Sequence, residues 1–178
     1  MHRYTSVTRR GVLKTAGGFL AAAATHAKGA EVPVSPVMAR LSTYMSEAAS
    51  HALPDDVVEK TKHHILDTFA AMISGADLPP GRVALQFARA HAGEKVATVA
   101  ASDVVCGAIE AALANGMLAH SDETDDSHAP SQSHPGCAVV PAALAAGEQF
   151  GIDGTHFLRS VALGYDVGPR VTMTLGDL

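Results

Sequence analysis

Two alanine-rich segments set the expected architecture, and they read GAIEAALANGMLA (residues 107–119) and AVVPAALAA (residues 138–146). Glu110 is the one charged residue in either segment. Alanine favours helices, and a helix with so little polar surface is typically buried on nearly all sides. We therefore expect both segments to be interior helices of an all-α bundle.

Four further helices are expected around these two. Apolar residues recur three and four positions apart over residues 37–52, 53–75 and 82–92 and in the segment after Asp153, as in amphipathic helices. Pro54 and the two acids that follow it suit a helix start, Gly75 an end, and Asp153 a helix cap.

The remaining segments are expected to connect these helices. Residues 79–81, Pro-Pro-Gly, predict a break, and residues 96–100 predict a short extended connector. Ser102 and Asp103 can cap a helix that would then run from Val104 to about Ala119.

Composition bounds the class of protein. The 178 residues suit one domain, or a leader followed by one domain, and 47% hydrophobic with 17% charged residues is typical of a globular chain. The net charge of -5 argues against a nucleic-acid partner. Cys106 and Cys137 match no metal-site spacing and predict buried thiols. No apolar run approaches the roughly 20 residues needed to span a bilayer.

Residues 1–30 differ in kind from the rest and predict a leader. Basic residues come first, a weakly apolar run follows, and small residues come last, which is the order of an export signal. Residues 8–14, TRRGVLK, resemble the twin-arginine pattern. We expect a periplasmic or otherwise exported protein, with residues 31–178 as its helical domain. The alternatives are a mitochondrial-type transit peptide or a basic tail on a cytoplasmic protein.

The segment between the two alanine-rich helices, HSDETDDSHAPSQSHPG (residues 120–136), concentrates acids, imidazoles and hydroxyls. Its carboxylates follow the C-terminal end of a helix, where the macrodipole disfavours each by roughly 0.3–1 kcal/mol. Crowded carboxylates raise one another's pKa, so one of them could hold a proton near neutrality. Histidines titrate near pH ~6.5, so the mixture suits general acid–base chemistry on a small molecule.

Three other interpretations of this segment remain open. A metal site is possible because histidine and aspartate ligands abound, although the spacing is not a strong metal signature. A serine hydrolase would need a Gly-x-Ser-x-Gly context, which none of the serines has. The segment could also be a polar loop that only caps helices.

The segment also carries a family resemblance. Residues 114–128, ANGMLAHSDETDDSH, followed by SHPG at 133–136, resemble the signature of the MmgE/PrpD family. That family includes 2-methylcitrate dehydratase, cis-aconitate decarboxylase and iminodisuccinate epimerase. Four flanking stretches agree with it: LPDDVV (53–58), LDTF (66–69), PAALA (141–145) and GYDV (164–167) with Arg170.

The resemblance implies a large all-helical domain with a smaller α/β lid, assembled as a homodimer in the full-length form. It implies proton abstraction next to a carboxylate of a small di- or tricarboxylate, as in 2-methylcitrate dehydratase. It implies neither a metal nor an organic cofactor. The expected partner is thus a small carboxylate substrate, with no nucleic acid and no membrane beyond export.

Position by position, the resemblance also assigns roles. His134 corresponds to the proton-transferring group, and Glu123 and Asp125 orient the site. Ser127 would donate a hydrogen bond to a substrate carboxylate. The substrate-binding set is Ser127, His128 and Asp126.

Two departures from the family pattern matter. Thr124 stands where family members commonly have a large apolar residue. The family's later catalytic histidine and lysines, and its lid, have no counterpart, and Arg159 and Arg170 are the nearest cations for an anionic substrate. We therefore expect an N-terminal segment that is incomplete and inactive alone. The alternatives are a non-catalytic exported helical module, for dimerisation or small-ligand binding, and a His/Asp metal-dependent hydrolase.

Overall fold

The computed structural model describes residues 33–176, which fall into two units. Residues 33–39 belong to the first unit and residues 40–176 form the second. Helix α2 (Pro36–Glu47) begins in the first unit and ends in the second. The predicted export leader, residues 1–30, lies outside the described residues.

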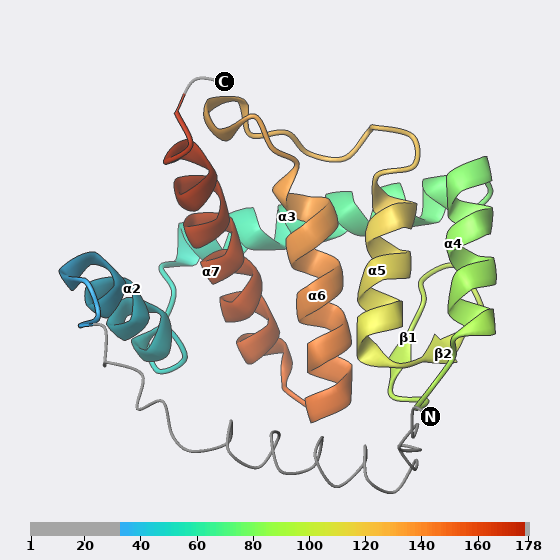
Figure 1. Cartoon of the computed structure of the whole chain (residues 1–178), viewed down its shortest axis with the longest axis horizontal. Helices are drawn as coiled ribbons and strands as arrows, with labels where there is room; N and C mark the ends of the chain where they lie inside the picture. Colours follow the sequence, from blue (N-terminus) through green and yellow to red (C-terminus); the bar gives the residue numbers. More distant parts are fainter. Residues whose placement is uncertain (1–32, 177–178) are drawn as a thin grey trace, which may run out of the picture. The chain divides into compact units, whose positions relative to one another are not determined.

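The second unit is an all-α bundle, as predicted. In Figure 1 helices α4, α5, α6 and α7 stand side by side, and α3 runs across behind them. None of the described helices is both long and apolar enough to cross a membrane. The helices of the bundle are α3 (Asp55–Gly75), α4 (Pro79–Ala90), α5 (Ala108–Ala119), α6 (Pro135–Phe150) and α7 (Gly154–Met173).

A two-stranded antiparallel sheet directly precedes the N-terminal end of α5. Strand β1 (Ala97–Thr98) pairs with β2 (Val105–Cys106), with Ala97 opposite Cys106. The fully buried Asn115 on α5 fixes this hairpin, because its Oδ1 accepts from the Ala100 N–H at 2.8 Å and its Nδ2 donates to the Thr98 carbonyl at 2.9 Å.

Helix ends that depend on local chemistry lie where the sequence predicts them. Helix α3 begins directly after Pro54, carries two acids in its first turn and ends at Gly75. Helix α7 begins after Asp153, whose side chain accepts a hydrogen bond from the His156 N–H at 2.8 Å. The start of α7 thus has a local side-chain cap, whereas the start of α3 has none.

Three other starts were predicted wrongly. Helix α5 begins at Ala108 rather than Val104, because residues 105–106 pair in β2, and the Ser102 hydroxyl accepts from the Val104 N–H within a turn. Helix α4 includes the proposed break and begins at Pro79, since a proline lacks only an N–H that a first turn leaves unused. Helix α6 begins at Pro135 for the same reason, ahead of Ala138.

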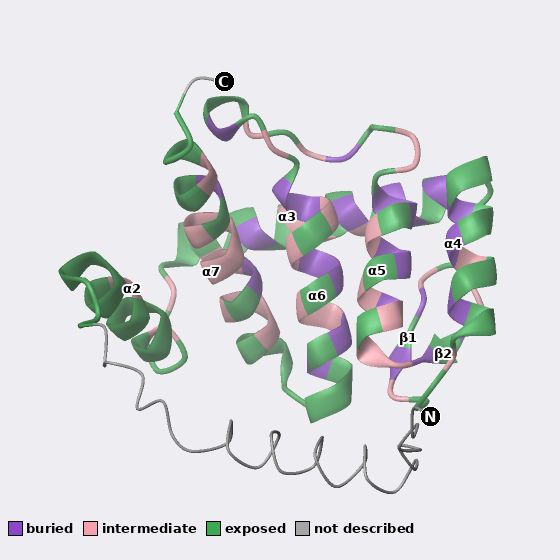
Figure 2. Cartoon of the chain, in the orientation of Figure 1, coloured by how far each residue is buried: buried purple, intermediate pink, exposed green. Residues whose placement is uncertain are grey.

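Small residues let the helices of the core approach closely. A Cβ added at Gly75 would overlap the Leu118 carbonyl of α5, and one at Gly116 would lie 2.8 Å from the Cys137 carbonyl of α6. The largest fully buried side chains include Met72, Leu118 and Val140. Figure 2 shows this buried stripe along the inner sides of the helices.

Helix α5 is less buried than its composition predicted. Ile109 is 82% exposed, and Leu113 and Met117 follow it on the same exposed face. The prediction of burial on nearly all sides is therefore wrong for this helix. Its opposite face packs against α3, α4 and α6, and low charge alone does not reveal which face does so.

Candidate active site

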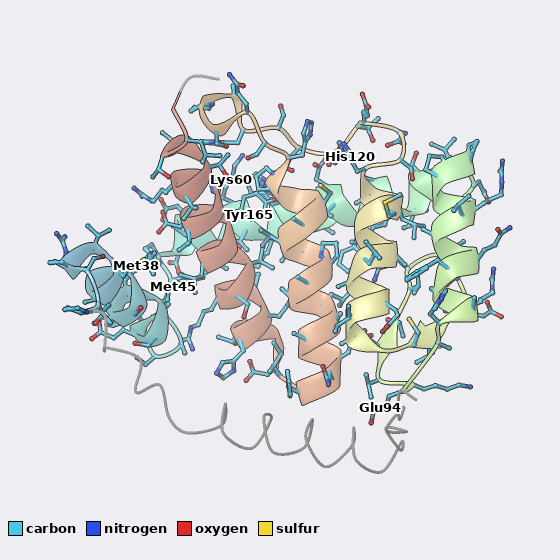
Figure 3. The ribbon with its side chains drawn as sticks, in the orientation of Figure 1. Met38, Met45, Lys60, Glu94, His120 and Tyr165 are labelled. Atoms are coloured by element: carbon cyan, nitrogen blue, oxygen red, sulfur yellow. The ribbon has the colours of Figure 1, made fainter. Side chains whose placement is uncertain are left out.

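The ends of two neighbouring helices bring two histidines to one place. His120 follows the last turn of α5, and His134 directly precedes α6. Helices α5 and α6 pack side by side, so the ends joined by residues 120–134 lie together. Figure 3 labels His120 where α5 passes into this loop. The geometry follows from the antiparallel arrangement of two close-packed helices.

Asp125 of the loop lies between these two histidines. Its Oδ1 is 3.0 Å from Nδ1 of His120 and 3.6 Å from Nδ1 of His134, and its Oδ2 is 3.2 Å from His120 Nδ1. The rings of the two histidines are 5.0 Å apart and tilted by 58°. The Asp125 side chain has 0% exposure, whereas the side chains of His120 and His134 are 47% and 40% exposed. A buried carboxylate thus meets the inner nitrogen of two solvent-accessible imidazoles.

Asp125 orients the ring of His120 by hydrogen bonds, and it lies beside Nδ1 of His134 at ion-pair distance. A carboxylate accepts hydrogen bonds, so a proton on Nδ1 of either histidine is favoured on the side that faces Asp125. In a neutral imidazole with its proton on Nδ1, the Nε2 atom has a free lone pair. His134 is therefore suited to exchange a proton through Nε2 with a molecule bound outside the loop.

Asp126, the next residue, belongs to a second cluster. Its Oδ1 accepts from the Gly136 N–H at 2.9 Å, and its Oδ2 lies 3.4 Å from Nδ1 of His64 on α3. The His64 ring stacks on Tyr165 of α7, with centroids 4.4 Å apart. Asp126 therefore ties the loop to the start of α6 and to a histidine of α3.

Burial dominates the electrostatics of this second cluster. Burial lowers the pKa of His64, and the Asp126 carboxylate opposes that shift. Burial raises the pKa of Tyr165, and the nearby Asp126 carboxylate raises it further. The Tyr165 hydroxyl is itself buried and makes no hydrogen bond of good geometry. Its environment favours a neutral phenol whose hydrogen-bonding capacity is unused.

His128 belongs to a third group that shapes the loop. Its Nδ1 lies 2.7 Å from the hydroxyl oxygen of the buried Ser131, which lies 2.7 Å from that of Ser133. The His128 N–H also donates to the Ser133 carbonyl at 2.8 Å. These contacts close the turn η1 (Ala129–Ser131) that precedes His134.

Glu123 and Ser127 lie apart from these clusters. Both are exposed, and neither side chain has a hydrogen bond among the described residues. Glu123 has φ +54°, a left-handed conformation that non-glycine residues seldom adopt. The loop thus presents a carboxylate and a hydroxyl to the solvent, in addition to the cluster of His120, Asp125 and His134.

Asp122, the carboxyl group closest to the α5 end, does not have the raised pKa that crowding predicts for one of these acids. Hydrogen bonds from the hydroxyls of Ser74 and Thr124 lower the pKa of the Asp122 carboxyl. Asp122 thus contacts Ser74 of α3 and Thr124 of its own loop.

One further ionisable group, the thiol of Cys137, contacts the cluster of His120, Asp125 and His134. Cys137 donates from its thiol to the His134 carbonyl at 3.2 Å. Burial raises the pKa of the Cys137 thiol to about 11, and the carboxylates of Asp125 and Asp126 raise it as well. A thiol with this pKa is protonated at neutral pH and is a poor nucleophile.

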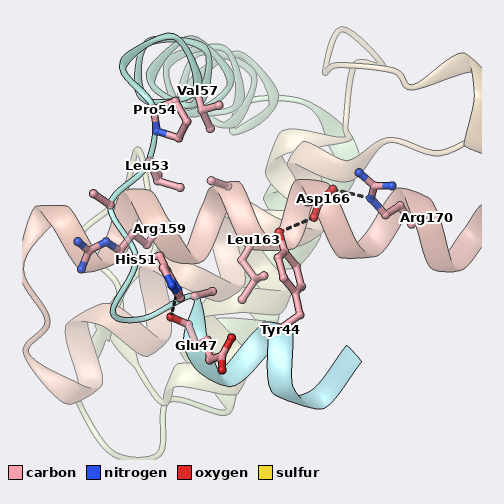
Figure 4. Close-up of a pocket in the computed structure, with 13 residues that line it drawn as sticks. Tyr44, Glu47, His51, Leu53, Pro54, Val57, Arg159, Leu163, Asp166 and Arg170 are labelled. Atoms are coloured by element: carbon pink, nitrogen blue, oxygen red, sulfur yellow. Dashed lines mark hydrogen bonds and ion pairs between the residues drawn. The ribbon is translucent and has the colours of Figure 1, made fainter. Parts of the chain in front are cut away.

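The two arginines expected near the site lie elsewhere. Arg159 donates to the Ala49 carbonyl at 3.0 Å, and Arg170 pairs with Asp166. Both line a separate cavity of about 620 Å³ beside Leu53 and Pro54, shown in Figure 4. Among the described residues, no recorded salt bridge joins a lysine or arginine to the carboxylates of the loop.

The structure thus sorts the predicted residues. It joins Asp125 and His134, ties Asp126 to α6, and places His128 in the turn η1. His120 was not among the predicted site residues, although it lies in the same segment, and neither were His64 and Tyr165. Spacing along the chain could not have found these two, because they come from helices distant in sequence.

Comparison with known proteins places these features in a family. The MmgE/PrpD N-terminal domain matches residues 39–177. The cis-aconitate decarboxylase-like protein oryM of Aspergillus oryzae is 28% identical over 146 residues, which are 78% of this chain and 30% of the relative. The cis-aconitate decarboxylase of Aspergillus terreus is 28% identical over 142 residues, 77% of this chain and 29% of its own.

A human relative gives the same picture. The cis-aconitate decarboxylase of Homo sapiens is 29% identical over 120 residues, 67% of this chain and 25% of its own. The matched part of this chain therefore spans less than a third of the length of the relatives named here.

Proposed function

The chain belongs to the MmgE/PrpD family, and from this premise we propose that it supplies the proton-transfer wall of an active site for small di- or tricarboxylates. The observation that carries the proposal is the buried carboxylate of Asp125 between His120 and His134. A buried acid that orients an accessible imidazole is an arrangement used for general acid–base catalysis.

In the proposed reaction His134 moves the proton. With its Nδ1–H on the side of Asp125, His134 takes a proton at Nε2 from the carbon next to a substrate carboxylate, and the electron pair of the broken C–H bond passes into that carboxylate to give an enediolate. The imidazolium formed is stabilised by the Asp125 carboxylate, and it returns the proton to the leaving hydroxyl, which departs as water, or to another carbon of the enediolate. His120, the second imidazole on the same carboxylate, shares the stabilisation of that charge.

Of the remaining loop residues, two would bind the substrate and two would stabilise the conformation of the loop. The free hydroxyl of Ser127 can donate a hydrogen bond to a substrate carboxylate, and the exposed Glu123 can accept one from a substrate hydroxyl. Asp126 keeps the loop on the start of α6, and His128 keeps the turn before His134 closed. These are the roles that support binding and orientation.

The proposed substrates are tricarboxylic acids of the cis-aconitate and 2-methylcitrate type. The names of the relatives support cis-aconitate, and the acid–base chemistry suits a reaction at a carbon next to a carboxylate. A trianionic substrate needs cations, and this loop is acidic. We therefore propose that the cationic groups come from polypeptide other than residues 33–176, and that this segment has no appreciable activity alone.

A chimera tests the proposal. Residues 39–177 would replace the matching part of the Aspergillus terreus cis-aconitate decarboxylase, and consumption of cis-aconitate would be followed by proton NMR. We expect turnover in the chimera, no turnover in this chain alone, and a loss of kcat of roughly 10²–10⁴-fold on His134→Gln, the range typical of a lost acid–base group.

The control is His63→Gln, because His63 is exposed on α3 and its side chain makes no recorded hydrogen bond or ion pair with the loop. It should leave kcat within twofold. Folding of each chimera would be checked by circular dichroism. A folded His134→Gln chimera that turns over cis-aconitate at the parent rate would refute the role of His134. Appreciable turnover by this chain alone would refute the shared site.

A further inference from the structure

We propose that His120, Asp125 and His134 form a binding site for one divalent transition-metal ion of the zinc type, and that this ion inhibits the site rather than serving it. The ligand atoms are Nδ1 of both histidines and a carboxylate oxygen of Asp125. Nothing in the family assignment requires such an ion, and its binding can be measured without any substrate.

The distances between the three ligand atoms fit one small cation. All three atoms lie within 4.8 Å of one another, with His120 and His134 at 3.0 Å and 3.6 Å from Asp125 Oδ1. Zinc binds nitrogen and oxygen at about 2.0–2.2 Å, so neighbouring ligands of a tetrahedral ion are roughly 3.3 Å apart. The two histidine-to-carboxylate separations bracket that value. An ion could be held with small rotations of the two rings.

The ligand types select the class of ion. Two imidazoles and one carboxylate suit zinc and its neighbours in the transition series, whereas magnesium and calcium prefer oxygen ligands alone. Three protein ligands leave a fourth position open to water or to a carboxylate of a bound molecule. The accessible histidines give the ion a way in, and the buried Asp125 gives it a negative charge that is shielded from water.

The proposed metal and the proposed proton transfer exclude each other. When a metal occupies Nδ1 of His134, the one proton of the neutral ring must lie on Nε2. The lone pair that would accept a substrate proton is then absent. This consequence rests on the proposed function, but the binding itself does not.

Calorimetric titration of Zn²⁺ into the full chain tests the site. We expect one ion per chain. His120→Ala and His134→Ala should each weaken binding by more than 100-fold, because loss of even an outer partner of a metal site costs about 10–100-fold. His63→Ala should keep the affinity within threefold, since His63 is exposed on α3 and makes no recorded contact with the three ligands.

Two further measurements make the result decisive. Circular dichroism would check that His120→Ala and His134→Ala remain folded. We expect both to fold, because both side chains are partly exposed. X-ray absorption at the zinc edge should show two imidazoles and no sulfur. Affinity unchanged in either histidine variant or a sulfur ligand would overturn the proposal. A chimera that fails to turn over cis-aconitate would contradict the proposed function but not the proposed metal site.

Discussion

At the residue scale, the adjacent aspartates Asp125 and Asp126 contact different partners. Asp125 faces the histidines at the ends of α5 and α6, whereas Asp126 faces the first turn of α6 and His64 of α3. Asp125 therefore lies beside the histidine for which we propose proton transfer, and Asp126 anchors the loop that carries it. Substitutions at the two positions should have different consequences despite identical chemistry.

The thiol of Cys137 reports the charge of Asp125. Burial is the main cause of its raised pKa of about 11, and Asp125 is the next. We expect Asp125→Asn to lower that pKa, because a neutral amide no longer disfavours the thiolate. The rate of iodoacetamide alkylation rises with pH as the thiolate forms. Measured from pH 7 to 11, the midpoint of that rise should therefore lie at a lower pH in the variant than in the parent protein.

The fully buried Cys106 should stay unlabelled in both proteins, so labelling of folded chain can be assigned to Cys137. The variant must be folded by circular dichroism for the comparison to hold. An unchanged pH profile in a folded Asp125→Asn protein would contradict the assigned cause.

At the element scale, the close packing of α7 on α6 depends on a glycine. A Cβ at Gly164 would lie 2.5 Å from Cγ1 and 3.1 Å from Cγ2 of Val139. We expect Gly164→Ala to lower the free energy of unfolding by about 1–3 kcal/mol, the usual cost of an overpacked core. Urea denaturation would measure it.

The same substitution at Gly154 is the matched control on α7. No atom lies within 4 Å of a Cβ added there, so Gly154→Ala should leave stability unchanged or raise it by up to ~1 kcal/mol. Combining Gly164→Ala with Val139→Ala removes the clashing methyl groups and should recover part of the loss. Equal effects of the two single alanine substitutions would rule out the packing explanation.

At the scale of the whole molecule, His64 makes stability depend on pH. Its pKa is lowered in the folded state, chiefly by burial, so below pH ~6.5 the unfolded chain binds more protons than the folded one. The stabilisation is present above the unfolded pKa and is lost as pH falls through the folded pKa. The free energy of unfolding should therefore decrease as pH falls below about 6.5, which urea denaturation at a series of pH values would measure.

His64→Gln should make that decrease smaller, since glutamine does not titrate. Asp126→Asn should lower the His64 pKa further, because the carboxylate opposes the effect of burial, and histidine NMR titration would show it. A His64 titration midpoint above the ordinary value would contradict the assigned direction.

Local chemistry determined much of this protein from the sequence alone. The all-α class, the ends of α3, the Asp153 cap of α7 and the family motif could all be read from residues close together in the chain. These features depend on backbone groups satisfied within a turn or on apolar spacing along one helix. That is why they could be predicted without knowledge of the packing.

Only the tertiary structure decided the rest. It showed that residues 105–106 form a strand, that α5 has an exposed apolar face, and that His120 shares Asp125 with His134. It also brought His64 and Tyr165, from helices α3 and α7, beside Asp126. Such contacts depend on which faces of distant helices meet. Sequence spacing carries no record of that choice, because it describes the faces of each helix separately.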